Sequence, residues 1–237
     1  MFTKAFRHLK KDPVMDFLIE KYHDKISLDD YKSTNYALSL SNLIIDQQIS
    51  FKAAITIKKR FAVLIKNLSH REILDLDNDK IQSIGISFRK VEYIKNVFTF
   101  FIDNEKEFIL FNEEKMQQEL ISIKGIGKWT IEMFLMFELG KPDIFSKGDI
   151  ALINSVKKNY KMDGLDKSKL DSLIKSWSPY NSTASLLLWK SVEEKVTFRK
   201  GDYYITTNQP AKRLLQHLKR LFHISNISNA FSVFIFI

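Results

Sequence analysis

A turn that contains two glycines is the segment of this sequence best suited to binding an anion. Gly125 and Gly127 flank Ile126, Lys124 and Lys128 lie on either side, and a helical pattern resumes directly afterwards. Unpaired N–H groups and the helix dipole at the start of such a helix bind a phosphate, and glycines let it approach the backbone closely. Both lysines would add positive charge there. The turn is therefore predicted to hold a phosphate, although an ordinary corner between two helices has the same local pattern.

Asp149 is the carboxylate best placed to act beside this turn. One expected helix and one loop separate it from Trp129, so its side chain can fold back over the start of the helix that follows the glycines. A carboxylate held there can stabilise a developing positive charge and can orient or deprotonate a water molecule. The spacing of Ser146 and Asp149 also fits a capping box, in which Asp149 would only stabilise a helix end. Both interpretations stay open from these residues alone.

The overall charge of the chain favours a polyanionic partner. It has 37 Lys and Arg against 28 Asp and Glu, which gives a formal net charge of +9. Basic side chains bind nucleic acid through phosphate contacts and the release of counterions. Because a lysine-rich composition can have other origins, the charge alone does not select this partner.

The absence of cysteine from all 237 residues excludes several kinds of chemistry. Without thiols the chain forms no disulfides, has no thiolate nucleophile and ligates neither zinc nor an iron–sulfur cluster through cysteine. Its histidines lack the spacing of metal ligands; they are His8, His23, His70, His217 and His223. The sequence shows no apolar run of the length that a signal peptide or a membrane span needs. We expect a soluble intracellular protein, cytoplasmic and associated with the nucleoid in a bacterium, or nuclear in a eukaryote.

The spacing of apolar residues predicts a protein built from helices. Glycine and proline are few, and much Leu, Ile, Lys and Glu favours long helices with short loops. Helices are expected after Asp12, over 33–68 with a break near Ile49 and Ser50, in a short segment ended by Gly85, and over 90–101, 114–121, 127–139, 150–160, 170–177 and 182–189. Only the stretch 196–207 has strand character, at 203–207. The predicted fold is all-α with an atypical tail.

Five groups of residues, taken together and in order, resemble one family. They are Ile123 to Met133; Pro142 to Phe145 with Gly148 and Asp149; Asp46 to Ser50 with Ala53 and Ala54; Gly85 to Ser87 with Lys90; and Trp177 to Tyr180 with Ser182, Ala184, Leu188 and Trp189. This set resembles the helix-hairpin-helix DNA glycosylase superfamily, and within it the 3-methyladenine DNA glycosylase II branch. The resemblance covers roughly residues 35–190 and is far more specific than any single motif.

The resemblance implies roles for particular residues. Asp149 matches the essential aspartate of the family, and Trp129 and Trp189 match aromatic positions that form the walls of the base pocket. Met133 belongs to the same pocket, at a position where some relatives carry Tyr. Gln48 matches the side chain that is wedged into the duplex to fill the gap left by a flipped base. Taken singly, the tryptophans would fit core packing and Gln48 a local hydrogen bond.

The activity implied by the resemblance is that of a monofunctional DNA glycosylase. Such an enzyme flips an alkylated purine out of double-stranded DNA and hydrolyses its N-glycosidic bond in base excision repair. Three alternatives remain: a non-catalytic helix-hairpin-helix DNA-binding protein, a glycosylase of the same superfamily for another lesion, and a helical protein–protein adaptor. We expect a monomer with no membrane partner and no cofactor, in particular no iron–sulfur cluster. A monovalent cation at the hairpin remains compatible with this expectation.

Trp129 also bears on the reaction type. Bifunctional relatives place a nucleophilic lysine at the position of Trp129, so Schiff-base lyase chemistry is not expected here. Lys128 is adjacent, but one residue turns a side chain by about 100° around a helix. The sequence therefore favours base excision without cleavage of the DNA strand.

The resemblance also implies two helical subdomains with the active-site cleft between them. We expect a glycosylase domain over 1–190, with a helical bundle at about 33–112, the hairpin subdomain at about 113–190, and an N-terminal helix that packs across. A basic extension of unassigned role would occupy 191–237, with helix-like spacing of basic and Leu residues over 212–221. Asn181 stands where close relatives often carry Arg, so an ion pair or a DNA contact is expected to be weaker.

Overall fold

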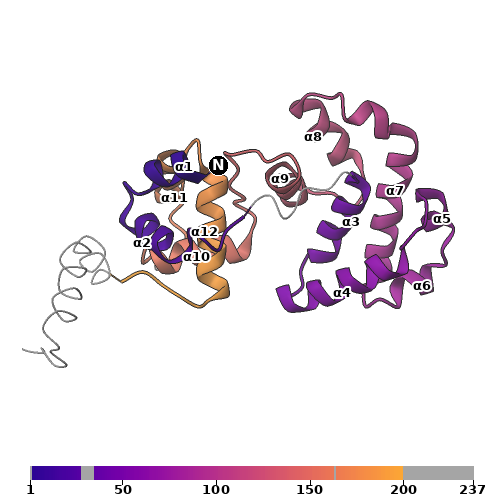
Figure 1. Ribbon diagram of the computed structural model, residues 1–237, viewed down its shortest axis with the longest axis horizontal. Coiled ribbons are helices and arrows are strands. Elements are labelled where there is room, and N and C mark those ends of the chain that lie inside the picture. The colour runs from indigo at the N-terminus through magenta and orange to yellow at the C-terminus, as the bar shows by residue number, and fades with distance from the viewer. Residues whose placement is uncertain (1, 28–34, 163, 200–237) are drawn as a thin grey trace, which may run out of the picture.

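The computed structural model describes residues 2–27, 35–162 and 164–199, and these residues form helices and loops without a strand (Figure 1). The helices are α1 (Phe2–Leu9), α2 (Pro13–Tyr22), α3 (Tyr36–Asp46), α4 (Phe51–Leu64), α5 (His70–Asp75), α6 (Asn78–Gln82), α7 (Phe88–Phe108), α8 (Glu113–Ser122), α9 (Lys128–Phe137), α10 (Ile150–Asn159), α11 (Lys167–Trp177) and α12 (Asn181–Glu193). The predicted all-α fold is confirmed. The expected strand at 203–207 and the basic stretch at 212–221 lie outside the described residues. In the described part of the chain, no helix combines the length and the apolar character needed to cross a membrane.

Most helix starts are explained by a short polar residue directly before them. Such a side chain accepts a hydrogen bond from an N–H group that has no partner within the helix. The residues that cap a helix in this way are Asp12, Asn35, Ser50, Ser69, Ser87, Asn112, Asp149 and Asp166. Ser50 starts α4 where the sequence predicted a break in the long helical stretch. Helix α1 was not anticipated, and α7 is longer at both ends than the expected 90–101.

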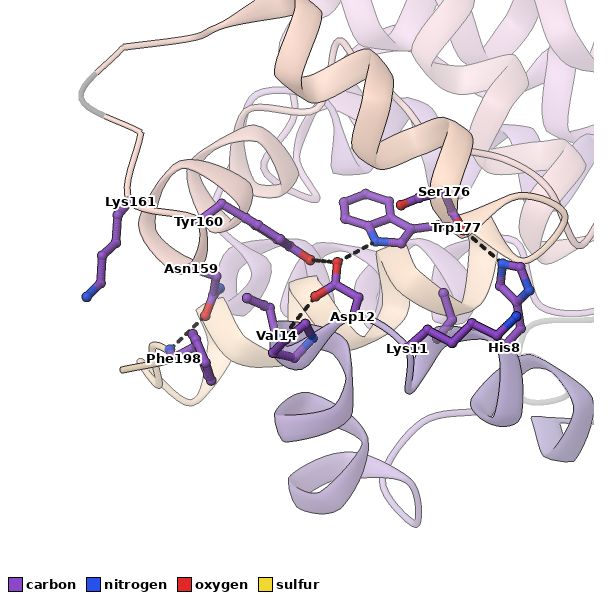
Figure 2. Close-up of a pocket in the computed structure, with 12 residues that line it drawn as sticks. His8, Lys11, Asp12, Val14, Asn159, Tyr160, Lys161, Ser176, Trp177 and Phe198 are labelled. Atoms are coloured by element: carbon purple, nitrogen blue, oxygen red, sulfur yellow. Dashed lines mark hydrogen bonds between the residues drawn. The ribbon is translucent and has the colours of Figure 1, made fainter. Parts of the chain in front are cut away.

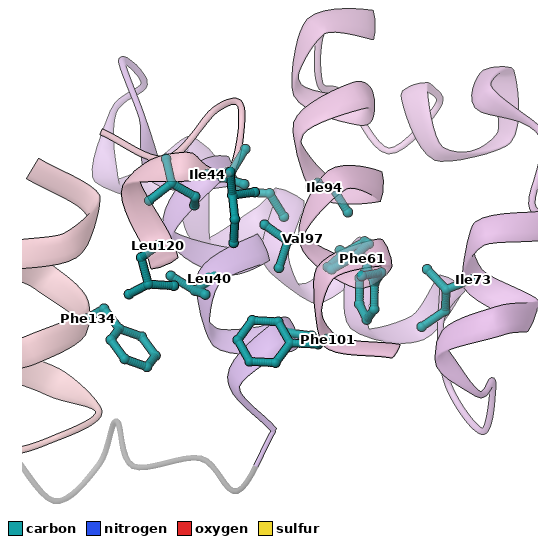
Figure 3. Packing of buried hydrophobic residues seen from close by; sticks show 14 of the residues in the cluster. Leu40, Ile44, Phe61, Ile73, Ile94, Val97, Phe101, Leu120 and Phe134 are labelled. Atoms are coloured by element: carbon teal, nitrogen blue, oxygen red, sulfur yellow. The ribbon is translucent and has the colours of Figure 1, made fainter. Parts of the chain in front are cut away.

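The first group of helices, α3 to α8, packs around one hydrophobic core. Leu40 and Ile44 of α3 meet Val97 and Phe101 of the long helix α7, and all four are almost fully buried (Figure 3). Helices α4, α5 and α6 add further apolar side chains, Phe61, Ile73 and Ile81 among them. Because all these helices bury apolar surface in the same core, they form one structural subdomain.

The second group consists of α1, α2, α10, α11 and α12. Its core contains Met15 and Leu18 of α2, Leu152 of α10, Trp177 of α11 and Leu187 of α12. The two N-terminal helices therefore belong to this group, although the whole first group and α9 separate them from α10 in the sequence (Figure 1). The N-terminal helix was expected to pack across the domain, and the apolar face of α2 is buried against α12 within the second group.

The predicted boundary between the subdomains at 112–113 was wrong. Met116 and Leu120 of α8, and Ile123 and Ile126 of the following turn, are buried in the core of the first group. Figure 3 shows Leu120 beside Leu40. The hairpin is thus built onto the bundle of α3 to α7, and the division falls at α9.

Helix α9 contacts both groups of helices. Ile131, Phe134 and Leu135 belong to the core of the first group. Met133 and Met136 belong to a separate small cluster, together with Leu186 of α12. In Figure 1, α9 accordingly lies between the two groups. The helix that begins at the hairpin is therefore held by packing on both sides.

Phe134 is expected to be essential for this packing. Its ring is fully buried and contacts the rings of Tyr36 and Phe108 edge-on. Phe134→Ala should lower the free energy of unfolding by about 3–5 kcal/mol, as large-to-small changes of buried aromatics do. Leu110→Ala is the control, because Leu110 is 84% exposed and its truncation should cost less than about 0.5 kcal/mol. Urea denaturation of both variants measures the difference, and equal stabilities would contradict the assigned role of α9.

Candidate active site

The hairpin joins α8 to α9 through the turn 123–127. The N–H of Ile126 donates to the carbonyl of Ile123, and Gly127 precedes α9 with extended backbone. Gly127 has no side chain with which to cap α9, so the first N–H groups of α9 keep the capacity to bind an external acceptor. The carbonyl of Gly127 already accepts from the N–H of Ile131, which fixes the start of the helix. This is the geometry that an anion at a helix N-terminus requires.

Gly125 and Gly127 of the hairpin occupy different surroundings, so glycine has a different structural role at each position. Gly125 has a φ of +106°, and a Cβ built on it would lie 2.2 Å from Cγ of Tyr93 on α7. Only glycine allows this backbone conformation and this close contact. Gly127 faces open space, because a Cβ built on it would meet nothing within 4 Å. Gly125 is therefore needed to dock the hairpin on α7, and Gly127 leaves the start of α9 accessible.

The other hairpin residues predicted to bind DNA are Lys124, Lys128 and Ile126, and they differ in exposure and in their partners. Lys124 is paired with Glu92 at 2.7 Å, and hydrogen bonding to Glu92 raises the pKa of Lys124. Lys128 is 86% exposed and lies 3.9 Å from Glu132, so its charge is open to solvent. The side chain of Ile126 is buried in the first core, so the DNA contact predicted for this residue, which stays a prediction, would involve its backbone.

Asp149 connects three helices through its carboxylate. It caps α10 by accepting from the N–H of Leu152 at 2.7 Å. The indole N–H of Trp129, from α9, donates to Oδ2 at 2.9 Å, and that of Trp189, from α12, donates to Oδ1 at 3.2 Å. The sequence predicted that the carboxylate folds back over the start of α9, and the structure has this arrangement. Because an ionised carboxylate only accepts hydrogen bonds, it matches these three donors.

The capping interpretation of Asp149 is correct in part. Asp149 does cap a helix, but as the residue that precedes α10 and not as the third residue after a capping Ser146. The hydroxyl of Ser146 instead donates to the carboxylate of Glu132 on α9.

The residues on either side of Asp149 are exposed. Ile150, which follows Asp149, is 77% exposed, and a Cβ built on Gly148 would meet nothing within 4 Å. The backbone around Asp149 is therefore open to a large partner.

An apolar cluster adjoins this carboxylate. Met133, Met136 and Leu186 form its buried part, and Trp129 and Trp189 pack against them while remaining partly exposed. Other partly buried residues complete it: Phe2, Ile26, Leu43, Phe137 and Ile144. The three predicted pocket residues, Trp129, Met133 and Trp189, are thus brought together.

The cluster differs from the prediction in two respects. Met133 is only 2% exposed, so it supports the indoles and does not form an open wall. The ring of Phe137 stacks on Trp189 with 6.0 Å between centroids, which covers one face of that indole. Phe137 was not identified from the sequence, although it lies eight residues after Trp129 and so shares its side of the helix.

Gln48 lies in the short loop between α3 and α4. Its side chain is exposed, and its φ of +56° is in the left-handed region that residues other than glycine seldom adopt. Such a conformation costs about 1–3 kcal/mol and is maintained only where neighbouring contacts impose it. The exposed, strained position agrees with the predicted wedge, which remains a prediction.

A second aspartate, Asp12, has a similar set of bonds at a different place (Figure 2). It caps α2, and its Oδ2 accepts from the hydroxyl of Tyr160 at 2.7 Å and from the indole of Trp177 at 3.2 Å. Burial, reinforced by the charge of Asp12, raises the pKa of Tyr160 well above its ordinary value. These residues line a cavity of about 560 Å³ among α1, α2, α10 and α11. Since Trp177 is buried in the second core, Asp12 joins helices there and provides a comparison for Asp149.

Asn181 has a role within the fold. It is buried, and its amide donates to Asp143 at 2.6 Å, while the hydroxyl of Ser178 donates to the other oxygen of the same carboxylate. At the position where the resemblance implied an arginine, the neutral amide of Asn181 therefore donates to a carboxylate. No group of three or more acidic or histidine side chains that could hold a metal occurs among the residues described.

The fold and the site belong to a known superfamily. Residues 42–179, more than half of the chain, match the profile of the HhH-GPD superfamily of base excision DNA repair proteins. The chain therefore belongs to this superfamily. The match includes α9, the hairpin and Asp149.

Relatives with names of this kind match more than half of the chain. The putative DNA-3-methyladenine glycosylase YfjP of Bacillus subtilis is 33% identical over an alignment of 164 residues that covers 63% of this chain and 56% of YfjP. The chain thus spans little more than half the length of that relative. DNA-3-methyladenine glycosylase 1 of Schizosaccharomyces pombe is 29% identical over an alignment of 161 residues that covers 64% of this chain and 70% of the relative.

Solved structures have the same arrangement of helices. The 3-methyladenine DNA glycosylase Mag1 of Schizosaccharomyces pombe, in complex with abasic DNA, superposes with a TM-score of 0.74 at 26% identity, over 81% of this chain and 97% of Mag1. A DNA-3-methyladenine glycosidase from Bacillus halodurans superposes with a TM-score of 0.57 at 29% identity, over 79% of this chain and 94% of that protein.

The two hairpin glycines are expected to respond differently to the same substitution. Gly125→Ala should lower the free energy of unfolding by about 3 kcal/mol, because of the contact with Tyr93 and the positive φ. Gly127→Ala should lower it by less than about 1 kcal/mol, since Gly127 has extended backbone and faces open space. Thermal and urea unfolding of the two variants measure the contrast. Equal losses would show that the hairpin does not depend on its docking against Tyr93.

Proposed function

We propose that this chain is a monofunctional DNA glycosylase that excises alkylated purines of the 3-methyladenine type from double-stranded DNA. The observation that carries the proposal is the Asp149 carboxylate, bonded by the indoles of Trp129 and Trp189 beside a partly exposed apolar cluster. Membership of a base excision repair superfamily and the names of the relatives support it. The net charge of +9 suits a DNA partner.

The reaction follows from these residues. A base within the duplex is first swung out, at a cost of a few kcal/mol, and Gln48 fills the gap that it leaves. The flipped purine lies against the apolar cluster, where an indole face attracts a cationic ring by about 0.5–2 kcal/mol. Alkylation has already made the base a good leaving group, so it departs with the electron pair of the N-glycosidic bond. The sugar then acquires oxocarbenium character.

Asp149 acts on the sugar. Its negative charge stabilises the oxocarbenium-like state, and it orients a water molecule whose oxygen bonds to the anomeric carbon. The proton lost by that water passes to the carboxylate or to solvent. Water and the lesion supply every atom of the products, an abasic site and a free base, so the proposed reaction requires no resident cofactor.

The identity of the α9 side chain that contacts Asp149 supports hydrolysis without strand cleavage. A lyase needs an amine close to the anomeric carbon, and the side chain bonded to Asp149 from the start of α9 is the indole of Trp129. Lys128 is directed toward Glu132 and solvent. Base release is therefore proposed to end at an intact abasic site.

Two matched variants test the role of Asp149. Asp149→Asn should reduce single-turnover release of 7-methylguanine from a duplex at least about 100-fold, with little change in DNA affinity, because the charge that stabilises the transition state is removed. Asp12→Asn is the control: it also disturbs an aspartate that caps a helix and accepts from an indole, so stability should fall by about 1–3 kcal/mol. Its release rate per folded molecule should stay within about threefold of the wild type.

The outcomes separate the candidate functions. Retained release by Asp149→Asn would remove the proposed mechanism. A wild-type protein that binds the alkylated duplex but never yields an abasic site would instead be a non-catalytic DNA-binding member of the superfamily.

Strand cleavage is tested independently. After incubation with an alkylated duplex, the DNA strand should remain intact until alkali is added, and borohydride should trap no protein–DNA adduct. Lys128→Ala serves as the control for an amine near the hairpin. A trapped adduct that disappears in Lys128→Ala would show that the chain acts as a lyase.

A further inference from the structure

Gln47 links the loop of Gln48 to the hairpin. Its side-chain amide donates to the carbonyl of Gly125 at 3.1 Å and to the hydroxyl of Thr130 at 3.1 Å. These two acceptors lie on either side of Gly127, one in the turn and one in the first turn of α9. Both hydrogens of the amide group are thereby used. A residue at the end of α3 thus holds the segment that is proposed to bind phosphate.

The backbone carbonyl of Gln47 is bound by a lysine of α7. The ammonium group of Lys90, on α7, donates to the carbonyl of Gln47 at 2.6 Å and to that of Ile45 at 2.9 Å. Burial lowers the pKa of Lys90, and the nearby charge of Asp46 opposes this shift. Lys90 therefore caps the end of α3, where the helix dipole favours a cation.

Helix α7 also holds the hairpin directly. The amide of Asn96 donates to the carbonyl of Lys124 at 3.2 Å, and Tyr93 packs against Gly125. The loop after α3, helix α7 and the hairpin are consequently joined in a closed set of contacts. Within this set, Gln47 is the residue that connects the loop to the hairpin by its side chain.

The position of Gln48 follows from this arrangement. Gln48 is the next residue after Gln47 and has a φ of +56° with an exposed side chain. Gln47 is itself only partly buried, and its side-chain hydrogen bonds reach both the turn and the first turn of α9. These hydrogen bonds therefore help to set where Gln48 stands relative to the start of α9.

We propose that Gln47 is a positioning residue that couples phosphate binding at the hairpin to insertion of Gln48 into the duplex. The inference rests on the proposed function. When the start of α9 binds a phosphate, the hydrogen bonds from Gln47 hold Gln48 at a fixed place along the DNA. Without the hydrogen bonds from Gln47, the hairpin still binds the DNA backbone. Gln48, however, no longer reaches the gap that the flipped base leaves in the duplex. The coupling matters most where a base pair must be opened.

The test compares a lesion in a base pair with the same lesion already unpaired. Gln47→Met keeps the length of the side chain and removes its donors. Release of 7-methylguanine paired with cytosine should slow by roughly 10- to 100-fold, and release of 7-methylguanine opposite an abasic analogue should slow less than about threefold. Gln82→Met, the same change on α6, is the matched control and should alter neither rate. Equal slowing on both duplexes would mean a structural role and would overturn the proposal.

A double variant shows whether Gln47 acts through Gln48. Gln48→Ala alone should slow release from the paired duplex, and adding Gln47→Met should slow it little further, because the wedge being positioned is already gone. Fully multiplicative losses would contradict the coupling.

A measurement independent of catalysis separates this inference from the proposed function. A duplex with an abasic analogue and 2-aminopurine in the opposite strand should fluoresce more strongly when the wild-type protein inserts its wedge, and less with Gln47→Met at equal saturation. If the wild type releases no base but Gln47→Met still lowers the fluorescence, the proposed function fails and the coupling stands. If release occurs and the fluorescence is the same for both proteins, the coupling fails.

Discussion

Helix α9 is buried on two opposite faces, and the positions of the site residues follow from this constraint. A helix turns by about 100° per residue, so Ile131, Phe134 and Leu135 share one face, and Met133 and Met136 lie on the other side of the axis. The first face completes the core of α3 to α8, and the second meets α12 through Leu186. A rotation or a shift of α9 would expose one of the two faces, so the helix has a single stable orientation.

The remaining sides of α9 are occupied by polar contacts. Thr130 accepts from Gln47 on one flank, and Glu132 accepts from Ser146 on the other. Trp129 precedes Met133 by one helical turn and therefore shares the face directed at α12, where its indole reaches Asp149. Lys128 is left on the solvent side. Helix geometry thus directs Lys128 away from the side of α9 that carries Trp129 and toward Glu132.

Asp149 illustrates how one side chain can serve both the fold and a reaction. Its bond to the N–H of Leu152 starts α10, and its bonds to two indoles join α9 and α12. Asp12 has the same kinds of partners, yet its indole partner Trp177 is buried in the second core. The difference lies in the surroundings: Asp149 is followed by the exposed Ile150 and lies beside indoles that remain partly exposed. Capping a helix is therefore no argument against a catalytic role.

The sequence predicted those features that depend on local patterns. The turn at Gly125, the helix start after Asp12 and the approach of Asp149 to Trp129 follow from spacing within short segments, and all three are present. The boundary at 112–113 was wrong because helix α8 has one apolar face, and the sequence does not say which core that face joins. The role of α2 was missed for the same reason.

Contacts between distant segments were the least predictable. Gln47 was visible within a motif, but its bonds to Gly125 and Thr130 cross 78 and 83 residues of sequence and leave no periodic signal. Phe2 and Ile26 join the cluster beside Trp129 only because α1 and α2 pack against the C-terminal helices. Phe137, by contrast, continues the helical spacing of Trp129 and Met133 and could have been included from periodicity.

The composition of the cluster beside Asp149 bears on which lesions the proposed reaction can serve. Its side chains are Met, Leu, Ile, Phe and Trp, none of which gives up a proton at neutral pH, and the two indole N–H groups are already bonded to Asp149. A base that leaves from such a surface receives no proton from these residues. A purine alkylated on a ring nitrogen needs none, because it departs as a neutral molecule. A neutral lesion such as hypoxanthine would depart as an anion unless solvent protonated it first, and the apolar surroundings disfavour that anion. Under the proposed reaction, this cluster therefore favours a base whose glycosidic bond is already weakened by alkylation.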